Sequence, residues 1–147
     1  MVDNMILGID HAALAVKDMS LALAFYCDLI GFEMVMEADI PPGIDGMNQA
    51  MDIDDASFKV CMIQMGSSRI ELFEFNQSIE SEQKRPVNKL GISHIALCSD
   101  CIEEDFDLMA LNGVDFNSQL FGTAPSRFAY GRDPFGNVIE LLEKLVD

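Results

Sequence analysis

The chain has 147 residues, of which 50% are hydrophobic and 23% are charged, a composition typical of a single globular domain. Its formal net charge of −16 repels phosphate groups, which argues against nucleic-acid binding and against highly anionic substrates. No apolar run approaches the roughly 18 residues that span a bilayer, and the N-terminal sequence MVDNMILGID lacks the basic and apolar regions of a secretory signal. We therefore expect one domain, residues 1–147, in the cytoplasm.

The cysteines are also consistent with the reducing environment of the cytoplasm. Without a targeting signal, we expect the thiols to be free and mostly buried. One pair has C-x-x-C spacing, but no second pair completes a zinc site, so this spacing is only a weak indication of metal or redox chemistry. The four cysteines are Cys27, Cys61, Cys98 and Cys101.

The first half of the chain has patterns typical of a strand, a helix and three more strands. A strand is expected over residues 6–16, with His11 in the middle. Asp18 can cap the helix that follows, and Gly31 can end it. The remaining strands are expected over 32–37, 58–65 and 68–75, the last two joined by a hairpin turn at Gly66-Ser67.

Two segments are polar and rich in turn-forming residues. Residues 40–55 contain Pro41-Pro42-Gly43 and several acidic side chains. They predict a long loop, of the kind that often forms a lid or a binding segment. Residues 76–88 contain Pro86 and are expected to link two halves of the chain.

The pattern then starts again. A strand over 91–98 leads into a helix over 101–112, which Asp100 can cap with Glu103 three residues later, the spacing of a capping box. Three strands are expected at 114–117, 128–132 and 138–143, the last two joined by a turn over 133–137.

Two sequence matches relate the halves. LGIDHAAL aligns with LGISHIAL, and the only two histidines of the chain, His11 and His94, occupy the same place in both copies. RIELFE aligns with VIELLE, which places Glu71 opposite Glu140, and the extra residues of the first copy fall in the 40–55 loop. An internal duplication explains these matches, with two βαβββ modules at about 5–75 and 90–145.

The repeated histidine and the repeated glutamate are residue types that bind divalent cations in proteins. A single histidine in an apolar strand is more often a core residue. Strand alternation places Arg69, Phe73 and Phe75 on the same face as Glu71, and a carboxylate in an apolar strand is costly to bury unless it is paired or bound to metal. The repetition of both residues favours a metal site.

The histidine strands, the two I-E-L strand endings and the D-P-F-G-N turn resemble the vicinal oxygen chelate superfamily. This superfamily includes glyoxalase I, methylmalonyl-CoA epimerase, extradiol dioxygenases, fosfomycin-resistance transferases and bleomycin-binding proteins. The resemblance covers residues 6–143. It implies an α+β fold in which two tandem βαβββ modules form a cupped mixed sheet around one divalent metal ion (Zn, Ni, Co, Mn or Mg). The implied ligands are His11, Glu71, His94 and Glu140.

A ligand set with two glutamates is similar to that of the isomerases and lyases of the superfamily. In them the metal polarises a carbonyl of a small α-oxo or thioester substrate, and a carboxylate moves the neighbouring proton by way of an enediolate. The resemblance gives that role to Glu140, or failing that to Glu71, and implies a homodimer. The expected substrate contacts are Phe73, Phe75, Arg69, Arg127, Tyr130 and Arg132.

Other interpretations remain open. Ala15 stands where glutathione-dependent glyoxalase I has an arginine that grips the tripeptide, which argues against glutathione as a substrate component. An extradiol-type dioxygenase would use two histidines and one glutamate on Fe(II), usually in a longer chain. A metal-free protein that sequesters a drug or a metabolite is the third alternative.

Overall fold

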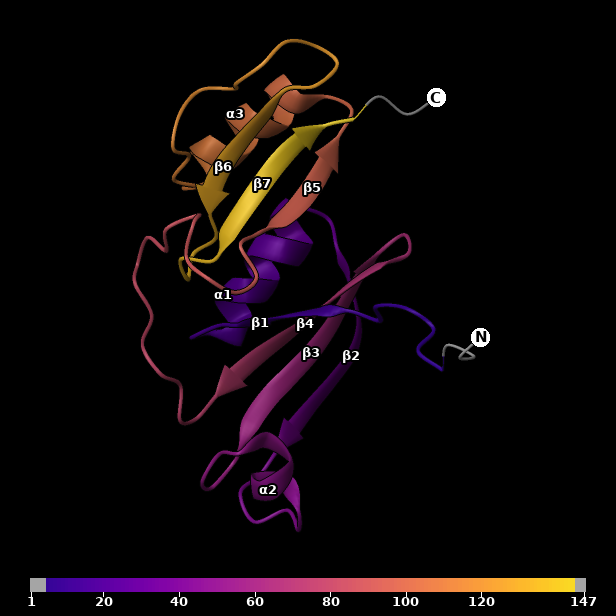
Figure 1. The fold of residues 1–147 in the computed structure, drawn as a ribbon, viewed down its shortest axis with the longest axis vertical. Helices are drawn as coiled ribbons and strands as arrows, with labels where there is room; N and C mark the ends of the chain where they lie inside the picture. The colour runs from indigo at the N-terminus through magenta and orange to yellow at the C-terminus, as the bar shows by residue number, and fades with distance from the viewer. Residues whose placement is uncertain (1–4, 145–147) are drawn as a thin grey trace. The chain divides into compact units, whose positions relative to one another are not determined.

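A computed structural model describes residues 5–144, which form two compact units, one up to Ile79 and the other from Glu80. Each unit contains a mixed β-sheet with helical segments (Figure 1). The α+β class expected from the sequence is confirmed. Within residues 5–144, every helix is too short or too polar to cross a membrane.

The sheet of the first unit has the strand order β1-β4-β3-β2. β1 runs parallel to β4, whereas β3 is antiparallel to both of its neighbours. α2 lies beyond the ends of β2 and β3 (Figure 1). The elements are β1 (Ala12–Ala15), α1 (Met19–Leu23) with its π-helical continuation η1 (Ala24–Leu29), β2 (Glu33–Ile40), α2 (Met47–Met51), β3 (Phe58–Met65) and β4 (Ser68–Phe75).

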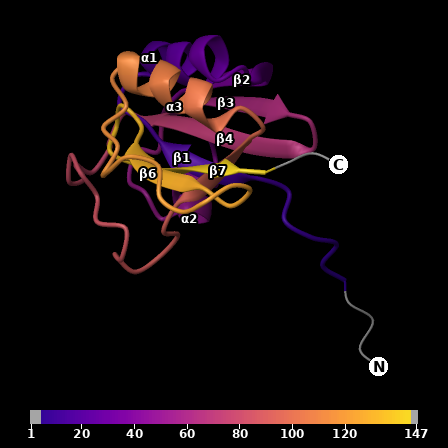
Figure 2. The ribbon, with the colours of Figure 1, turned by 90° about the horizontal axis from the view of Figure 1, so that it is seen from above.

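The helix of the first unit begins and ends as its sequence predicts. The Asp18 carboxylate accepts a hydrogen bond of 2.9 Å from the Leu21 N–H, and Gly31 follows the last turn with a φ of +101°, a conformation that glycine adopts without strain. α1 packs on one face of the sheet (Figure 2), against β4, where Ile70 and Leu72 are buried. The alternate residues of β4 therefore lie on the opposite, half-exposed face.

The sheet of the second unit has the order β5-β7-β6, with β5 parallel to β7 and β6 antiparallel to it. α3 covers one face (Figure 2), where it contacts β7 and buries Ile102, Phe106 and Met109. The turn before β7 is held by Asp133, whose carboxylate accepts hydrogen bonds from the N–H groups of Phe135 and Asn137 at 2.9 and 2.8 Å. The elements are β5 (Ile95–Ser99), α3 (Ile102–Leu111), β6 (Phe128–Arg132) and β7 (Val138–Glu143).

The two histidine strands are shorter than predicted. β1 begins at Ala12 rather than at residue 6, and β5 begins at Ile95 rather than at residue 91. In the observed registers, the residues before Asp10 would fall opposite the tight turn at Gly66-Ser67, and the residues before His94 would fall opposite the turn over 133–137, so these residues have no partner strand. Both histidines therefore immediately precede a strand.

Two further predictions for the second unit are wrong. Residues 114–117 do not form a strand, because Val114 packs its side chain against β6 and the described backbone bond to β6 is from Asn117 N to Tyr130 O, at 2.8 Å. Asp100 does not cap α3. The N-cap is Cys101, whose N–H donates to the Ser99 hydroxyl at 3.1 Å.

The two segments predicted as loops contain little regular structure. β2 continues through Ile40, and the long loop after it contains the short helix α2. Residues 76–88 contain no helix or strand, as expected of a linker.

The structure corrects one prediction about the cysteines. All four thiols are free. The expectation that they are mostly buried is wrong for Cys98 and Cys101, which are exposed.

Candidate metal and substrate site

The two histidines have the same relation to the two glutamates. In the first unit Ala13 is the β1 partner of Glu71, and His11 lies two residues before Ala13. In the second unit Ala96 is the β5 partner of Glu140, and His94 lies two residues before Ala96. Because side chains two residues apart share a face, each histidine projects beside its glutamate, and the alanine between them leaves room.

The distances are nearly identical in both units. His11 Nε2 lies 3.0 Å from Glu71 Oε2, and His94 Nε2 lies 3.1 Å from Glu140 Oε2. The glutamate side chains are 18% and 13% exposed, so each carboxylate is largely removed from water but can be reached from the open face of its sheet. The structure thus forms two His–Glu pairs, one in each unit.

In the first unit a second carboxylate fixes the imidazole. Asp10 Oδ2 lies 2.7 Å from His11 Nδ1, and Arg69 Nη1 donates to Asp10 Oδ1 at 3.0 Å. The hydrogen bond to Asp10 raises the pKa of His11, and the hydrogen bond to His11, followed by the charge of Arg69, lowers the pKa of Asp10. Sequence reasoning missed Asp10, although its position directly before the histidine was visible. Arg69, expected as a substrate contact, is thus partly engaged in holding Asp10.

The second unit holds its histidine differently. Ser93 Oγ lies 3.1 Å from His94 Nδ1 and donates to the Val87 carbonyl at 2.8 Å. The Tyr130 ring meets the His94 ring edge to face, with centroids 5.1 Å apart. Tyr130 is also the β6 partner of Glu140. Burial, then the charge of Glu140, raises the pKa of Tyr130.

The remaining predicted substrate residues fall into two groups. Phe73 and Phe75 stack with centroids 5.0 Å apart on the Glu71 face of β4, and Phe58 packs against both. Arg127 does not face Glu140. Its guanidinium is bonded to Glu143 at 2.5 and 2.8 Å and also to Glu103 of α3.

Arg132 is buried and donates to the carbonyls of Arg85 and Gly131 at 2.9 and 3.0 Å. Both of its described bonds are to backbone oxygens within its own unit. Together with the engagement of Arg127, this gives the two arginines structural partners in place of the substrate contacts expected from the sequence.

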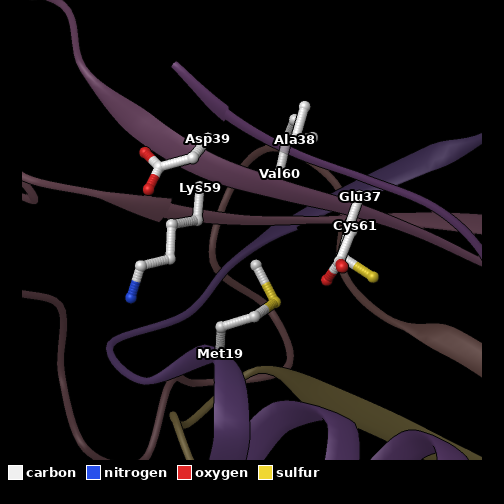
Figure 3. A pocket seen from close by; sticks show the side chains of 7 residues that line it. All are labelled: Met19, Glu37, Ala38, Asp39, Lys59, Val60 and Cys61. Carbon is white, nitrogen blue, oxygen red and sulfur yellow. The ribbon is translucent and has the colours of Figure 1, made fainter. Parts of the chain in front are cut away.

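A hollow of about 400 Å³ lies on the other face of the first sheet, between α1 and strands β2 and β3 (Figure 3). Lys59 lies at this hollow and bonds to Glu74 at 3.1 Å. Cys61 is buried there, and burial raises the pKa of its thiol to about 11, so the thiolate is scarce at neutral pH. Because Lys59 and Cys61 alternate with the β3 residues that face Glu71, this hollow is separate from the His11–Glu71 pair.

The donor chemistry of the pairs fits a divalent metal ion. Each pair offers one imidazole nitrogen and one carboxylate oxygen about 3 Å apart, the donor types that divalent ions take from proteins. Within residues 5–144, no group of three or more His, Cys, Asp or Glu side chains is gathered around one metal position. Each pair therefore offers two donors.

The structure defines an α+β protein built from two similar units, each of which places a histidine beside a glutamate on one sheet face. The sequence profile of the Glyoxalase/Bleomycin resistance protein/Dioxygenase superfamily matches residues 8–141. The chain belongs to this superfamily, as its resemblance to the vicinal oxygen chelate proteins implies.

Individual proteins extend this likeness. YaeR of Escherichia coli (strain K12), itself described as uncharacterized, is 27% identical over 139 residues, which are 92% of this chain and 95% of YaeR. A glyoxalase family protein from Bacillus cereus has the same fold, with a TM-score of 0.87, 24% identity and 99% of each chain covered. A variant of the fosfomycin resistance protein FosX from Listeria monocytogenes, complexed with Mn(II) and 1S,2S-dihydroxypropylphosphonic acid, has a TM-score of 0.65 and 21% identity, covering 97% of this chain and 96% of its own.

Proposed function

We propose that the protein is a metal-dependent isomerase or lyase that moves a proton next to a carbonyl of a small α-oxo or thioester substrate. The observation that carries this proposal is the repeated His–Glu pair, built at the same strand register in both units. Each glutamate lies on the sheet face away from the helix, where a carboxylate is costly to remove from water unless it is paired or bound to metal.

His11, Glu71, His94 and Glu140 would hold the metal ion. The two pairs come from the two units, either of one chain or of two chains in a homodimer. Mn(II) in the FosX complex supports a divalent ion, and the mixed nitrogen and oxygen donors suit Mn, Zn, Ni, Co or Mg. When bound, the ion would supply a positive charge that polarises the substrate carbonyl and acidifies the neighbouring C–H group.

Glu140 would act as the base. It accepts the proton from the carbon next to the carbonyl, the electron pair of the broken C–H bond moves into an enediolate, and the carboxylic acid so formed returns the proton to the neighbouring carbon. The strand partner of Glu140 is Tyr130, whose polar hydroxyl could orient a carboxylate, whereas the strand partner of Glu71 at the equivalent place is Met62, which offers no hydroxyl. This difference between the units favours Glu140 over Glu71 as the base.

The experiment is proton exchange in deuterated water. Candidate α-oxo and thioester compounds are incubated with manganese-loaded protein, and deuterium incorporation at the carbon next to the carbonyl is followed by NMR. Glu140→Gln should abolish the exchange, because the amide cannot accept the proton. Glu104→Gln removes an equal charge from an exposed position of α3, which covers the face of the second sheet opposite Glu140, and should leave the exchange unchanged.

Exchange that persists at the wild-type rate in Glu140→Gln would contradict the assignment of the base. Absence of exchange with every α-oxo and thioester compound, in protein that does carry metal, would contradict the isomerase or lyase activity itself.

A further inference from the structure

The hollow on the helix-covered face of the first sheet has an apolar floor and a rim of carboxylates. Its volume of about 400 Å³ lies in the range of small-molecule sites. Glu37 of β2 is the register partner of Cys61 of β3, and partners in an antiparallel pair project on the same face. The next pair on that face is Asp39 and Lys59. Met19, at the start of α1, points into the hollow from the helix side (Figure 3).

The floor of the hollow is formed by two sulfur-containing side chains, Met19 and Cys61. Cys61 is 1% exposed, and burial, followed by the electrostatic effects of Cys27 and Glu37, raises the pKa of its thiol to about 11. The thiol therefore stays protonated at neutral pH and behaves as a small apolar group. The Met19 side chain is flexible and adapts to the shape of the group that it contacts. This floor suits a short chain of methylene groups.

The single lysine at the hollow is already paired. Lys59 Nζ bonds to Glu74 Oε1 at 3.1 Å, and the other oxygen of Glu74 accepts a hydrogen bond of 2.6 Å from the Met19 N–H. The hydrogen bond and the charge of Glu74, followed by the charges of Asp39 and Asp18, raise the pKa of Lys59. Lys59 thus lies among more carboxylates than it can neutralise.

The rim carboxylates, Glu37 and Asp39, carry the excess negative charge. Both residues are exposed, and within residues 5–144 neither carboxylate forms a hydrogen bond or a close ion pair. They are two residues apart on a strand that rises about 3.4 Å per residue, so their Cα atoms lie about 7 Å apart. A chain of four methylene groups holds two terminal nitrogens roughly 6 Å apart. With charge-assisted bonds of about 2.8 Å at both ends, such a molecule can reach both carboxylates.

We infer that this hollow binds a short aliphatic diamine, with one ammonium group at each rim carboxylate and the methylene chain over the apolar floor. The whole chain, with 25 acidic and 9 basic residues, attracts a doubly charged cation to this surface. The residues of the hollow alternate along β3 with those that face Glu71. The diamine site is therefore separate from the His–Glu pairs and does not depend on the proposed function.

The test compares 1,4-diaminobutane with 1-aminobutane, which has the same carbon chain and one ammonium group. Isothermal titration calorimetry measures the binding of each to the wild-type protein at low and at moderate salt. We expect the diamine to bind at least about tenfold more tightly, and its affinity to fall as salt is added. Magnesium ion has the charge of the diamine without its methylene chain, and at equal concentration it should not displace the diamine.

NMR of methionine methyl groups locates the bound diamine. The Met19 signal should shift on addition of 1,4-diaminobutane, because the methylene chain lies against this side chain. The Met65 signal is the control, since Met65 is on β3 outside the hollow and is 42% exposed, and it should not move.

Glu37→Gln and Asp39→Asn should each weaken diamine binding by roughly five- to twentyfold, because each removes the charge that one ammonium group contacts. Glu33→Gln is the matched control. It removes the same charge from an exposed position of the same strand, four residues from Glu37 and outside the hollow, and should change the affinity by less than about twofold.

Equal affinity for the diamine and the monoamine, displacement by magnesium at equal concentration, or an equal loss in Glu33→Gln and Glu37→Gln would overturn the inference. Each of these results would indicate a diffuse attraction of cations to an acidic chain. Failure of the diamine to bind, or binding that leaves the Met19 signal unchanged, would overturn it as well.

Discussion

Single side chains distinguish the two otherwise similar pairs. His11 is held by an acceptor that is itself bonded to an arginine, whereas His94 is held by a serine hydroxyl and by ring contact with Tyr130. A carboxylate behind a metal-binding imidazole fixes the ring orientation and increases its basicity. We therefore expect His11 to be the more strongly anchored ligand of the two.

Asp10→Asn tests this expectation. The amide retains the shape of the side chain and loses its charge, so the affinity for Mn(II) should fall by about tenfold. Ser93→Ala, at the equivalent place in the second unit, should have a smaller effect. Dissociation constants from calorimetric titration of the metal-free protein provide the comparison. Equal affinities for wild type and Asp10→Asn would show that Asp10 does not support the metal site.

At the level of secondary structure, the turns and the partner strands determine which strand ends could be predicted from the sequence. β3, β4, β6 and β7 have the predicted bounds, because two tight turns with clear sequence signals fix their ends. β1 and β5 were predicted too long, since Ile6, Leu7 and Ile9 look like strand residues although the partner strand does not reach them and all three are exposed. Apolar pattern alone does not reveal where a parallel partner ends.

The contact between Gly131 and the segment after α3 explains the missing strand. A Cβ on Gly131 would lie 2.8 Å from Val114 Cγ1 and 3.0 Å from Phe116 Cδ1, so this segment packs with its side chains against β6. Gly131→Ala should lower the free energy of unfolding by about 1–3 kcal/mol through overpacking, as measured by urea denaturation.

Adding Val114→Ala to Gly131→Ala should recover part of that loss, because the smaller side chain makes room for the new methyl group. If the two substitutions instead prove additive, the close contact is not the cause.

Arg127 directly precedes β6. Its guanidinium binds Glu143 of β7 and Glu103 of α3, and so connects three elements of the second unit. The hydrogen bonds to Arg127 lower the pKa values of both glutamates below their ordinary value of 4.5. Their contribution to stability is therefore complete above about pH 4.5 and is lost as the pH falls through the lowered values.

The free energy of unfolding of the wild type should decrease between about pH 6 and about pH 3, and Glu143→Gln should flatten that decrease while lowering stability at about pH 6. Urea denaturation at several pH values measures both. An unchanged slope in Glu143→Gln would assign the acid sensitivity to other carboxylates.

The whole chain is best understood as a duplication in which the two copies carry a histidine and a glutamate at matching positions, His11 and Glu71 in the first and His94 and Glu140 in the second. The repeat was visible in the sequence, and with it the four candidate ligands. The sequence did not reveal the partners behind the two imidazoles or the structural engagement of Arg127, because these depend on contacts across strands that no local pattern encodes.

We propose that the two His–Glu pairs together hold one divalent ion. Metal analysis of protein purified without chelator is the most direct test. Mass spectrometry should find about one divalent ion per chain, the number that four ligands can hold. His11→Ala, Glu71→Ala, His94→Ala and Glu140→Ala should each lose most of the ion, while Glu104→Gln retains it. Retention by Glu71→Ala alone would point instead to the two-histidine, one-glutamate site of an oxygenase. A wild-type protein that is free of metal, and whose melting temperature does not respond to added manganese, nickel, cobalt or zinc, would contradict the claim.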